Sequence, residues 1–61
     1  MRKVQYIVGT KECERALAYD DAHKSALYHM FFGWRKTFTI LSLEVMEFRF
    51  TNKEIELIER G

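Results

Sequence analysis

The sequence is poor in the features that stabilise a small fold covalently or through a metal. It contains one cysteine, Cys13, and no proline among its 61 residues. A single cysteine excludes an internal disulfide and any zinc site built from paired thiolates. A chain of this length buries only about 60% of its unfolded surface, so its fold is marginal without a supplement. We expect self-association to be that supplement, and we expect no metal and no cofactor.

The chain also lacks an excess of charge of either sign, and it lacks a long apolar run. Lys and Arg number 10 against 9 Asp and Glu, for a formal net charge of +1. This balance argues against a strong nucleic-acid binder and against an acidic mimic of DNA. No window approaches the roughly 20 apolar residues that cross a bilayer, and the charged start MRKVQYIVG is too short for a signal peptide. We therefore expect a cytoplasmic protein with no membrane partner.

Glycine is scarce, and the sequence has no motif of a known catalytic site. The three glycines are isolated, which excludes a Gly-rich phosphate loop and a G-x-S-x-G nucleophile motif. Asp20 and His23 could share a metal or act as an acid–base pair, but ligands on a single helix do not close a site. We interpret Asp20 and Asp21 as solvated, His23 as the edge of an apolar stripe, and Cys13 as a small core side chain. The chain is predicted not to be an enzyme.

What the sequence does contain is one long apolar, β-branched stretch, TFTILSLEVMEFRF, at residues 37–50. Such a composition favours a β-strand. With a period of two, one face is apolar at both ends and the other only in the middle, so the stretch either bends or breaks into a hairpin near Ser42–Glu44. Both alternatives leave apolar side chains on both faces. We interpret the stretch as a poorly protected sheet edge that pairs across a two-fold axis, with self-association through Leu41, Leu43 and Val45.

The rest of the chain predicts one strand and two helices. Residues 3–8 alternate as a short strand that ends at Gly9. Thr10 is a suitable N-cap, and residues 11–32 have no breaker and an apolar stripe at helical spacing, which predicts one helix of about five to six turns that stops at Gly33. A capping box at residues 51–54 starts a short C-terminal helix. We predict a single α+β domain over residues 1–61, whose antiparallel sheet is completed by dimerisation.

The most suggestive surface cluster is aromatic and basic, and it comprises Phe32, Trp34, Arg35 and Lys36. Aromatic side chains beside cations hold single-stranded nucleic acids by stacking and phosphate contacts. The same residue types anchor protein interfaces, and the aromatic residues could instead complete the core. Because the net charge is near zero, a protein partner is favoured over nucleic acid.

The predicted function is that of a regulator, inhibitor or adaptor that binds a macromolecule, with single-stranded nucleic-acid binding as the alternative. A phage or mobile-element origin is a further hypothesis, which rests on the habits of such small proteins and not on any residue.

Residues 50–61, FTNKEIELIERG, resemble the opening helix of LuxR-type helix-turn-helix domains. The resemblance is confined to these residues and to a common capped-helix pattern. The chain ends at Gly61, before a turn and a recognition helix, so we expect no DNA reading by this motif. No family is indicated for the chain as a whole.

Overall fold

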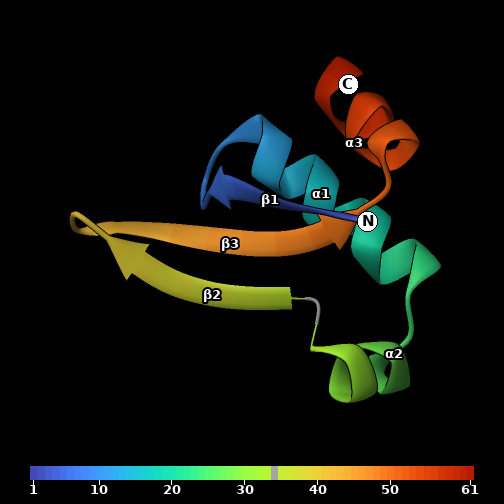
Figure 1. Cartoon of the computed structure of the whole chain (residues 1–61). Helices are drawn as coiled ribbons and strands as arrows, with labels where there is room; N and C mark the ends of the chain where they lie inside the picture. The colour runs from blue at the N-terminus through green and yellow to red at the C-terminus, as the bar shows by residue number, and fades with distance from the viewer. Residues whose placement is uncertain (34) are drawn as a thin grey trace.

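A computed structural model describes residues 1–33 and 35–61 as a three-stranded sheet with helices (Figure 1). In chain order, the elements are β1 (Arg2–Ile7), α1 (Lys11–His23), α2 (Ala26–Phe32), β2 (Arg35–Ile40), β3 (Leu43–Phe50) and α3 (Asn52–Arg60). The strands lie in the order β1-β3-β2, and both neighbouring pairs are antiparallel. The predicted α+β class and the antiparallel sheet are confirmed.

The apolar stretch at residues 37–50 folds as a hairpin and not as one strand. β2 and β3 are joined by Leu41 and Ser42, whose φ angles of 51° and 68° both lie in the left-handed region. Of the two alternatives, the hairpin is therefore correct, and its turn begins one residue earlier than expected. The expectation that the stretch forms a sheet edge is wrong for β3, because β3 is the central strand and is paired on both sides.

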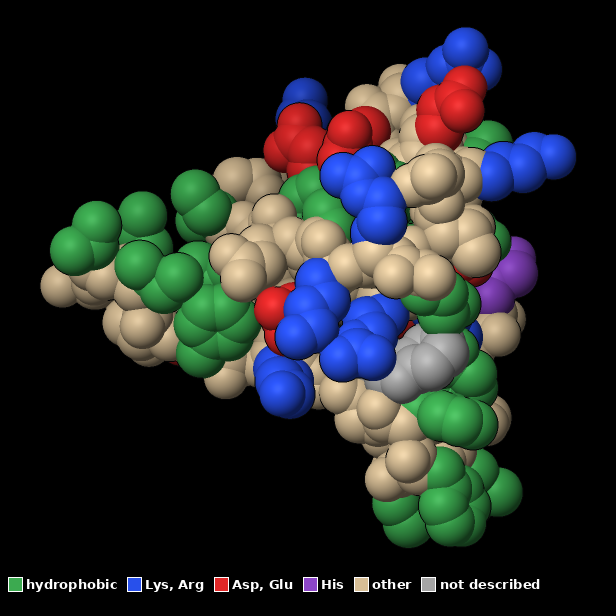
Figure 2. All heavy atoms as spheres, viewed as in Figure 1, with side chains coloured by type: hydrophobic (Ala, Val, Ile, Leu, Met, Phe, Trp, Pro, Cys, Tyr) green, Lys and Arg blue, Asp and Glu red, His purple; other side chains and the backbone are tan. Residues whose placement is uncertain are grey.

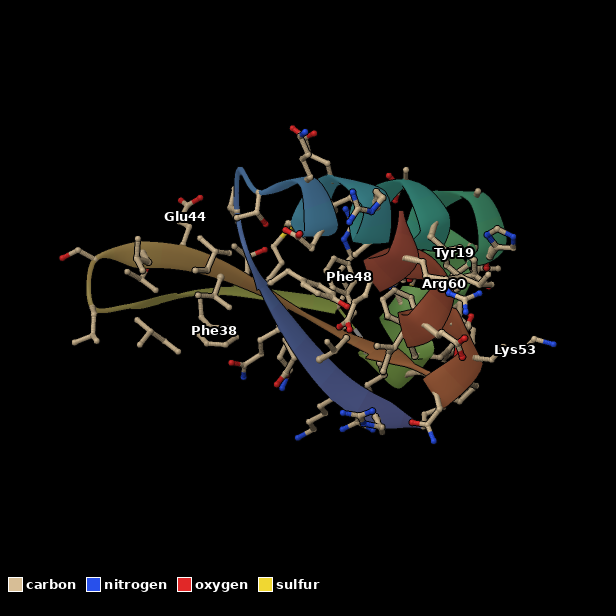
Figure 3. All side chains as sticks on the ribbon, turned by 90° about the horizontal axis from the view of Figure 1, so that it is seen from above. Tyr19, Phe38, Glu44, Phe48, Lys53 and Arg60 are labelled. Carbon is tan, nitrogen blue, oxygen red and sulfur yellow. The ribbon has the colours of Figure 1, made fainter. Side chains whose placement is uncertain are left out.

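The two-residue turn decides which side chains share a face of the sheet. Ile40 pairs with Leu43 and Phe38 with Val45, so the apolar side chains of β2 lie on the same face as these two residues of β3. Figure 3 shows Phe38 and Glu44 on opposite sides of the sheet, with Glu44 on the side that carries α1. The alternating pattern changes phase at the turn, which is why neither face of the uninterrupted stretch is uniformly apolar.

The core lies between one face of the sheet and the helices α1 and α3. Its buried residues are Tyr6, Cys13, Ala16, Met46, Phe48, Phe50, Ile55 and Ile58. The rings of Phe48 and Phe50 are stacked, with centroids 5.3 Å apart, and neither residue is exposed. Full burial of such a side chain contributes roughly 1.5–3 kcal/mol of stability. The predicted core position of Cys13 is confirmed.

The prediction of one helix over residues 11–32 is wrong, because the chain leaves the helical conformation between α1 and α2. Lys24 is extended, with φ −133° and ψ 132°, and Ser25 caps α2 by accepting a hydrogen bond from the Tyr28 amide. At this break the Lys24 amine donates to the carbonyl oxygen of Arg49 at 2.7 Å. A polar tertiary contact thus accompanies a break that no local breaker residue announces.

The helix boundaries that depend on capping residues are confirmed. The Thr10 hydroxyl accepts a hydrogen bond from the Cys13 amide at the start of α1. Gly33 ends α2 with a φ of 57°, which glycine adopts without strain. Thr51 and Glu54 form the capping box at the start of α3, and the side chain of each accepts a hydrogen bond from the backbone amide of the other.

Candidate functional site

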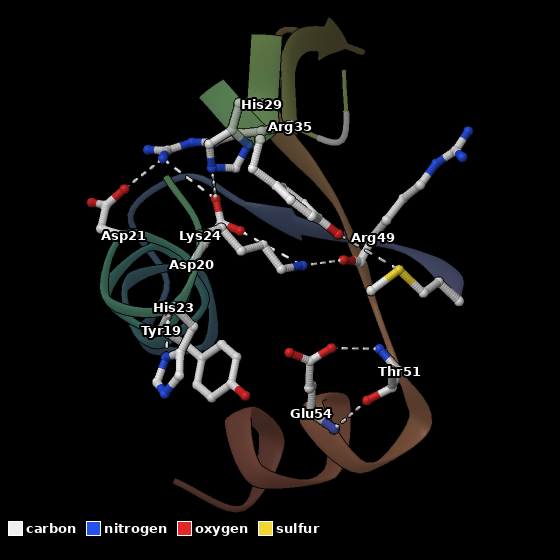
Figure 4. Close-up of polar contacts among 12 residues, drawn as sticks. Tyr19, Asp20, Asp21, His23, Lys24, His29, Arg35, Arg49, Thr51 and Glu54 are labelled. Carbon is white, nitrogen blue, oxygen red and sulfur yellow. Dashed lines mark hydrogen bonds and ion pairs between the residues drawn. The ribbon is translucent and has the colours of Figure 1, made fainter. Parts of the chain in front are cut away.

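A buried carboxylate joins α1, α2 and β2 (Figure 4). Asp20 is only 1% exposed, and three basic side chains approach it. The His29 Nε2 and Arg35 Nη1 atoms lie 3.0 and 3.5 Å from Asp20 Oδ2, and the Lys24 Nζ atom lies 3.9 Å from Oδ1. Arg35 Nη1 also donates to Asp21 Oδ1 at 2.6 Å. We call Asp20, Lys24, His29 and Arg35 the Asp20 cluster.

The electrostatics of this cluster are dominated by burial. Desolvation raises the pKa of Asp20, and the charges of His29, Lys24 and Arg35 lower it by less. Among the described residues, neither ring nitrogen of His29 has a partner with hydrogen-bond geometry, although Nε2 lies 3.0 Å from Asp20 Oδ2. Burying the Asp20 carboxylate therefore has a net electrostatic cost. We interpret the Asp20 cluster as a contact that fixes the position of α2 and not as a source of net stability.

The interpretation of two solvated aspartates is wrong for Asp20, although Asp21 is exposed. His23 is not the partner of Asp20 either. Its ring stacks on Tyr19 with centroids 4.0 Å apart, and its Nδ1 donates to the Tyr19 carbonyl at 2.9 Å. The imidazole that approaches Asp20 is that of His29, which the sequence places nine positions later in another helix. The available signal was the position of Asp20 on the apolar stripe of α1, where a charge is buried only with partners.

Helix α2 presents its large apolar side chains to solvent. None of its residues is buried. We call its four exposed large apolar residues the α2 patch: Leu27 (59%), Met30 (71%), Phe31 (76%) and Phe32 (55%). In Figure 2 the lower projection of the molecule is green because these side chains gather there. The predicted apolar stripe is therefore wrong beyond α1, because α2 turns away from the sheet (Figure 1) and leaves Leu27, Met30 and Phe31 exposed.

The four predicted partner-binding residues do not form one described cluster. Phe32 belongs to the α2 patch, and Trp34 lies outside the described residues. Arg35 is directed inward to the Asp20 cluster, whereas Lys36 lies on the other face of β2, opposite Glu47 in the register. Their role in binding stays a prediction. The surface that the prediction missed is the rest of the α2 patch, whose signal was the nearly all-apolar segment ALYHMFF.

A second exposed apolar surface lies on the face of the sheet opposite α1 and α3, toward the hairpin turn. It comprises Ile7, Phe38, Ile40, Leu43 and Val45, which we call the hairpin patch. Ile7 and Ile40 are each 44% exposed and Leu43 is 50% exposed, whereas Val45 is buried between its strand neighbours. Of the predicted self-association residues, Leu43 and Val45 lie in this patch, and the highly exposed Leu41 lies in the adjoining turn.

The same open face is charged at its other end. Lys3, Lys36, Glu47 and Arg49 share it in the register of the three strands, and we call them the charged band. In Figure 2 this band is the blue and red surface between the green hairpin end and the green α2 end. The face is thus divided into an apolar half and a charged half.

A hollow of about 270 Å³ on the surface of the described residues is lined by Met1, Arg2, Thr51 and Asn52, which include no carboxylate, imidazole or thiol. Within residues 1–33 and 35–61, no group of three or more His, Cys, Asp or Glu side chains could hold a metal ion. In the same part of the chain, no helix has the length and apolar character to cross a bilayer.

No protein family model matches the chain, and neither a curated protein nor a solved structure is detectably similar to it. What the protein does must therefore be inferred from the α2 patch, the hairpin patch and the Asp20 cluster.

Proposed function

We propose that this protein acts by binding another protein through the α2 patch, as a small regulator, inhibitor or adaptor without catalytic activity. The observation that carries the proposal is the outward row of Leu27, Met30 and Phe31, which are 59–76% exposed. Their i, i+3, i+4 spacing places them on one side of α2, where they match the anchors by which a helix enters an apolar groove. A groove of that kind on a partner protein is the expected counterpart.

The attachment of α2 supports a role in presentation. A helix of seven residues is not stable by itself in water. Here it is capped by Ser25 and held through His29, whose ring lies 3.0 Å from the buried Asp20 carboxylate. The polar contact faces inward and the apolar row faces outward, so a partner meets a helix that is already formed. Such preorganisation reduces the entropy lost on binding.

Nucleic acid and membrane are the less favoured partners of this surface. Single-strand binding needs cations beside the aromatic side chains, but Arg35, which follows α2 in the sequence, already pairs with Asp20 and Asp21. Helices that lie in a membrane interface carry Lys or Arg on their polar face, and the α2 segment ALYHMFF has neither. A protein groove requires no positive charge from α2.

We also propose that the protein is a homodimer and that it works in the cytoplasm. The half-exposed hairpin patch supports self-association, since a chain this small gains most from covering further apolar surface. The lone thiol of Cys13 is buried, and burial raises its pKa. An unpaired cysteine of this kind fits a reducing compartment.

The test uses two matched variants of the full chain. Phe31→Asn removes the most exposed aromatic side chain of the α2 patch, and Leu57→Asn removes a 54% exposed leucine of α3 as the control. Each immobilised protein is exposed to lysate of the cells that encode it, with and without nuclease treatment, and retained proteins are identified by mass spectrometry. The identified partner is then purified and its affinity measured by calorimetry.

We expect the wild type and Leu57→Asn to retain the same partner with similar affinity. Phe31→Asn should weaken the purified complex by about 2 kcal/mol, or roughly 30-fold, as expected for an aromatic hot spot. Equal affinities for all three proteins would contradict the proposal. A partner that is lost on nuclease treatment, with a log–log salt slope near −0.7 for each phosphate contacted, would favour the nucleic-acid alternative.

A further inference from the structure

The sheet carries two apolar surfaces on opposite faces, and the helices of the chain cover only one of them. On the helix side, the half of β3 near α3 is apolar and buried, as Phe48 and Phe50 illustrate. Toward the hairpin turn, that same side carries the exposed Thr37, Thr39 and Glu44. The apolar side chains there face the other way and form the hairpin patch. The reversal indicates that the hairpin end is built to be covered from the side opposite α1 and α3.

We propose that a second copy of this chain covers the hairpin patch, by face-to-face stacking of the two hairpins about a two-fold axis. This inference deepens the self-association proposed above and uses a surface separate from the α2 patch. Two stacked sheets lie about 10 Å apart with interdigitating side chains. Ile40 and Leu43 of one copy would pack against the same residues and Phe38 of the other.

The division of the open face into two halves supports a second copy as the occupant. A two-fold axis through the hairpin patch lays apolar half on apolar half. The hairpin patch and the charged band lie at opposite ends of the face. The charged bands of the two copies therefore both lie outside the region where the two hairpin patches overlap. Lys36 and Arg49 stay beside Glu47 in water, and none of these charges is buried. The patch is therefore complementary to itself.

The size of the patch is also suitable. A stable homodimer buries about 800 Å² on each copy, which is roughly a fifth of the 4403 Å² surface of this chain. The hairpin patch supplies the apolar centre of such an area. Leu41, at 91% exposed, stands at the tip, where the stacked arrangement brings it over the partner's hairpin.

Two other arrangements account for the surface less well. Pairing of two β2 edges would extend the sheet to six strands, but it would leave Ile7, Ile40 and Leu43 exposed to water. Insertion of the α2 patch of one copy into the hairpin patch of the next is a head-to-tail contact. Such a contact generates rings or open chains and does not stop at two copies unless the rotation closes.

A matched pair of variants on one strand tests the proposal. Ile40→Lys places a charge in the hairpin patch, and Thr39→Lys places the same charge on the neighbouring residue, which is exposed on the opposite face. Sedimentation equilibrium over a dilution series gives the mass and the dimer dissociation constant of each protein, and circular dichroism reports whether it is folded.

We expect the wild type and Thr39→Lys to be dimers with dissociation constants within about threefold of each other. Ile40→Lys should weaken the dimer by at least roughly 100-fold, because a lysine would be buried without a partner. If Ile40→Lys does not fold, isotope-filtered NMR on a wild-type dimer of labelled and unlabelled copies tests the stacked arrangement directly. Contacts between the methyl groups of Ile40 or Leu43 and the Phe38 ring of the other copy support stacking.

A monomeric wild type would overturn the inference, as would masses that grow beyond the dimer. Inter-copy backbone contacts between Thr37 and Thr39 would also overturn it, because they indicate β2 edge pairing. Equal dissociation constants for Ile40→Lys and Thr39→Lys would do the same. The α2 proposal fails separately, since Phe31→Asn should remain a dimer whichever partner it has lost.

Discussion

Replacement of Asp20 by asparagine tests whether the Asp20 cluster holds α2 in place. The change keeps the size of the side chain and removes its charge. Lys24 is then affected most, because its side chain is only 7% exposed and its amine loses the counter-charge at 3.9 Å. Removal of one member of a buried ion pair costs about 3–5 kcal/mol.

Three features of the site reduce this figure. The Lys24 amine keeps its bond to the Arg49 carbonyl at 2.7 Å and its position 4.4 Å from the centre of the Phe50 ring. Arg35, with 29% of its side chain exposed, retains its pairing with Asp21. The Asp20 carboxylate itself is penalised by burial, as its raised pKa indicates. We therefore expect a loss of about 2–3 kcal/mol, or about 10–20 °C in Tm for a domain of this size.

Urea unfolding followed by circular dichroism measures this loss, with Asp21→Asn as the control. Asp21 is 64% exposed in its side chain, so its removal should change stability by less than about 1 kcal/mol. The double variant Asp20→Asn with Lys24→Met should recover at least about 1 kcal/mol of the loss, because no buried charge remains at that position. Hydrogen exchange should show that Asp20→Asn loses amide protection in α2 before α1.

An Asp20→Asn protein as stable as Asp21→Asn, within about 0.5 kcal/mol, would refute this account. The same would be true if α1 and α2 lost amide protection equally. The cluster would then be a consequence of where α2 lies and not the reason for it.

Two further predictions concern α3 and the hairpin turn. Burial raises the pKa of Glu54, but hydrogen bonds from the Thr51 backbone and the Tyr19 hydroxyl lower this pKa by a larger amount. The pKa in the folded protein therefore lies below the ordinary 4.5. The ionised Glu54 thus contributes stability above pH 4.5 that is lost as pH falls through the folded value, and Glu54→Gln should flatten the acid side of a stability profile measured by urea unfolding. An unchanged acid slope would contradict this assignment. At the turn, Ser42 has a φ of 68°, so Ser42→Gly should raise stability by about 0.5–1 kcal/mol in a thermal melt, and a loss of stability would show that the turn is not left-handed in solution.

The parts of the fold that could be predicted from the sequence depend on residues close together in the chain. Thr10, Gly33 and Thr51 mark helix ends because each interacts with backbone groups within four positions. The strand predicted at residues 3–8 and found at residues 2–7 is indicated by its own alternation, and Cys13 falls in the core because of its place on the stripe of α1. The α+β class follows from these local patterns.

The hairpin turn could be recognised only in outline. Its two central residues, Leu41 and Ser42, both have positive φ, yet neither is the Asn or Gly that usually announces such a turn. The alternation on either side showed that the stretch had to bend or break, but not at which residue. The register in the structure decides it, and with it which apolar side chains lie on the open face.

The candidate surfaces were decided by tertiary structure for a different reason. A buried charge is tolerated only where its partners converge. Lys24 is four positions from Asp20 at the end of α1, but His29 and Arg35 lie in segments that only the fold brings close to it. No glycine or proline interrupts residues 11–32, and the capping residue Ser25 and the apolar segment ALYHMFF do not by themselves show that α2 turns outward and exposes Phe31. Length and composition together determined that this chain would have more apolar surface than it can bury, because a small chain buries a smaller fraction of its surface on folding. Only the packing of α1 and α3 on one face of the sheet decided where that surplus lies: on α2 and on the open side of the hairpin.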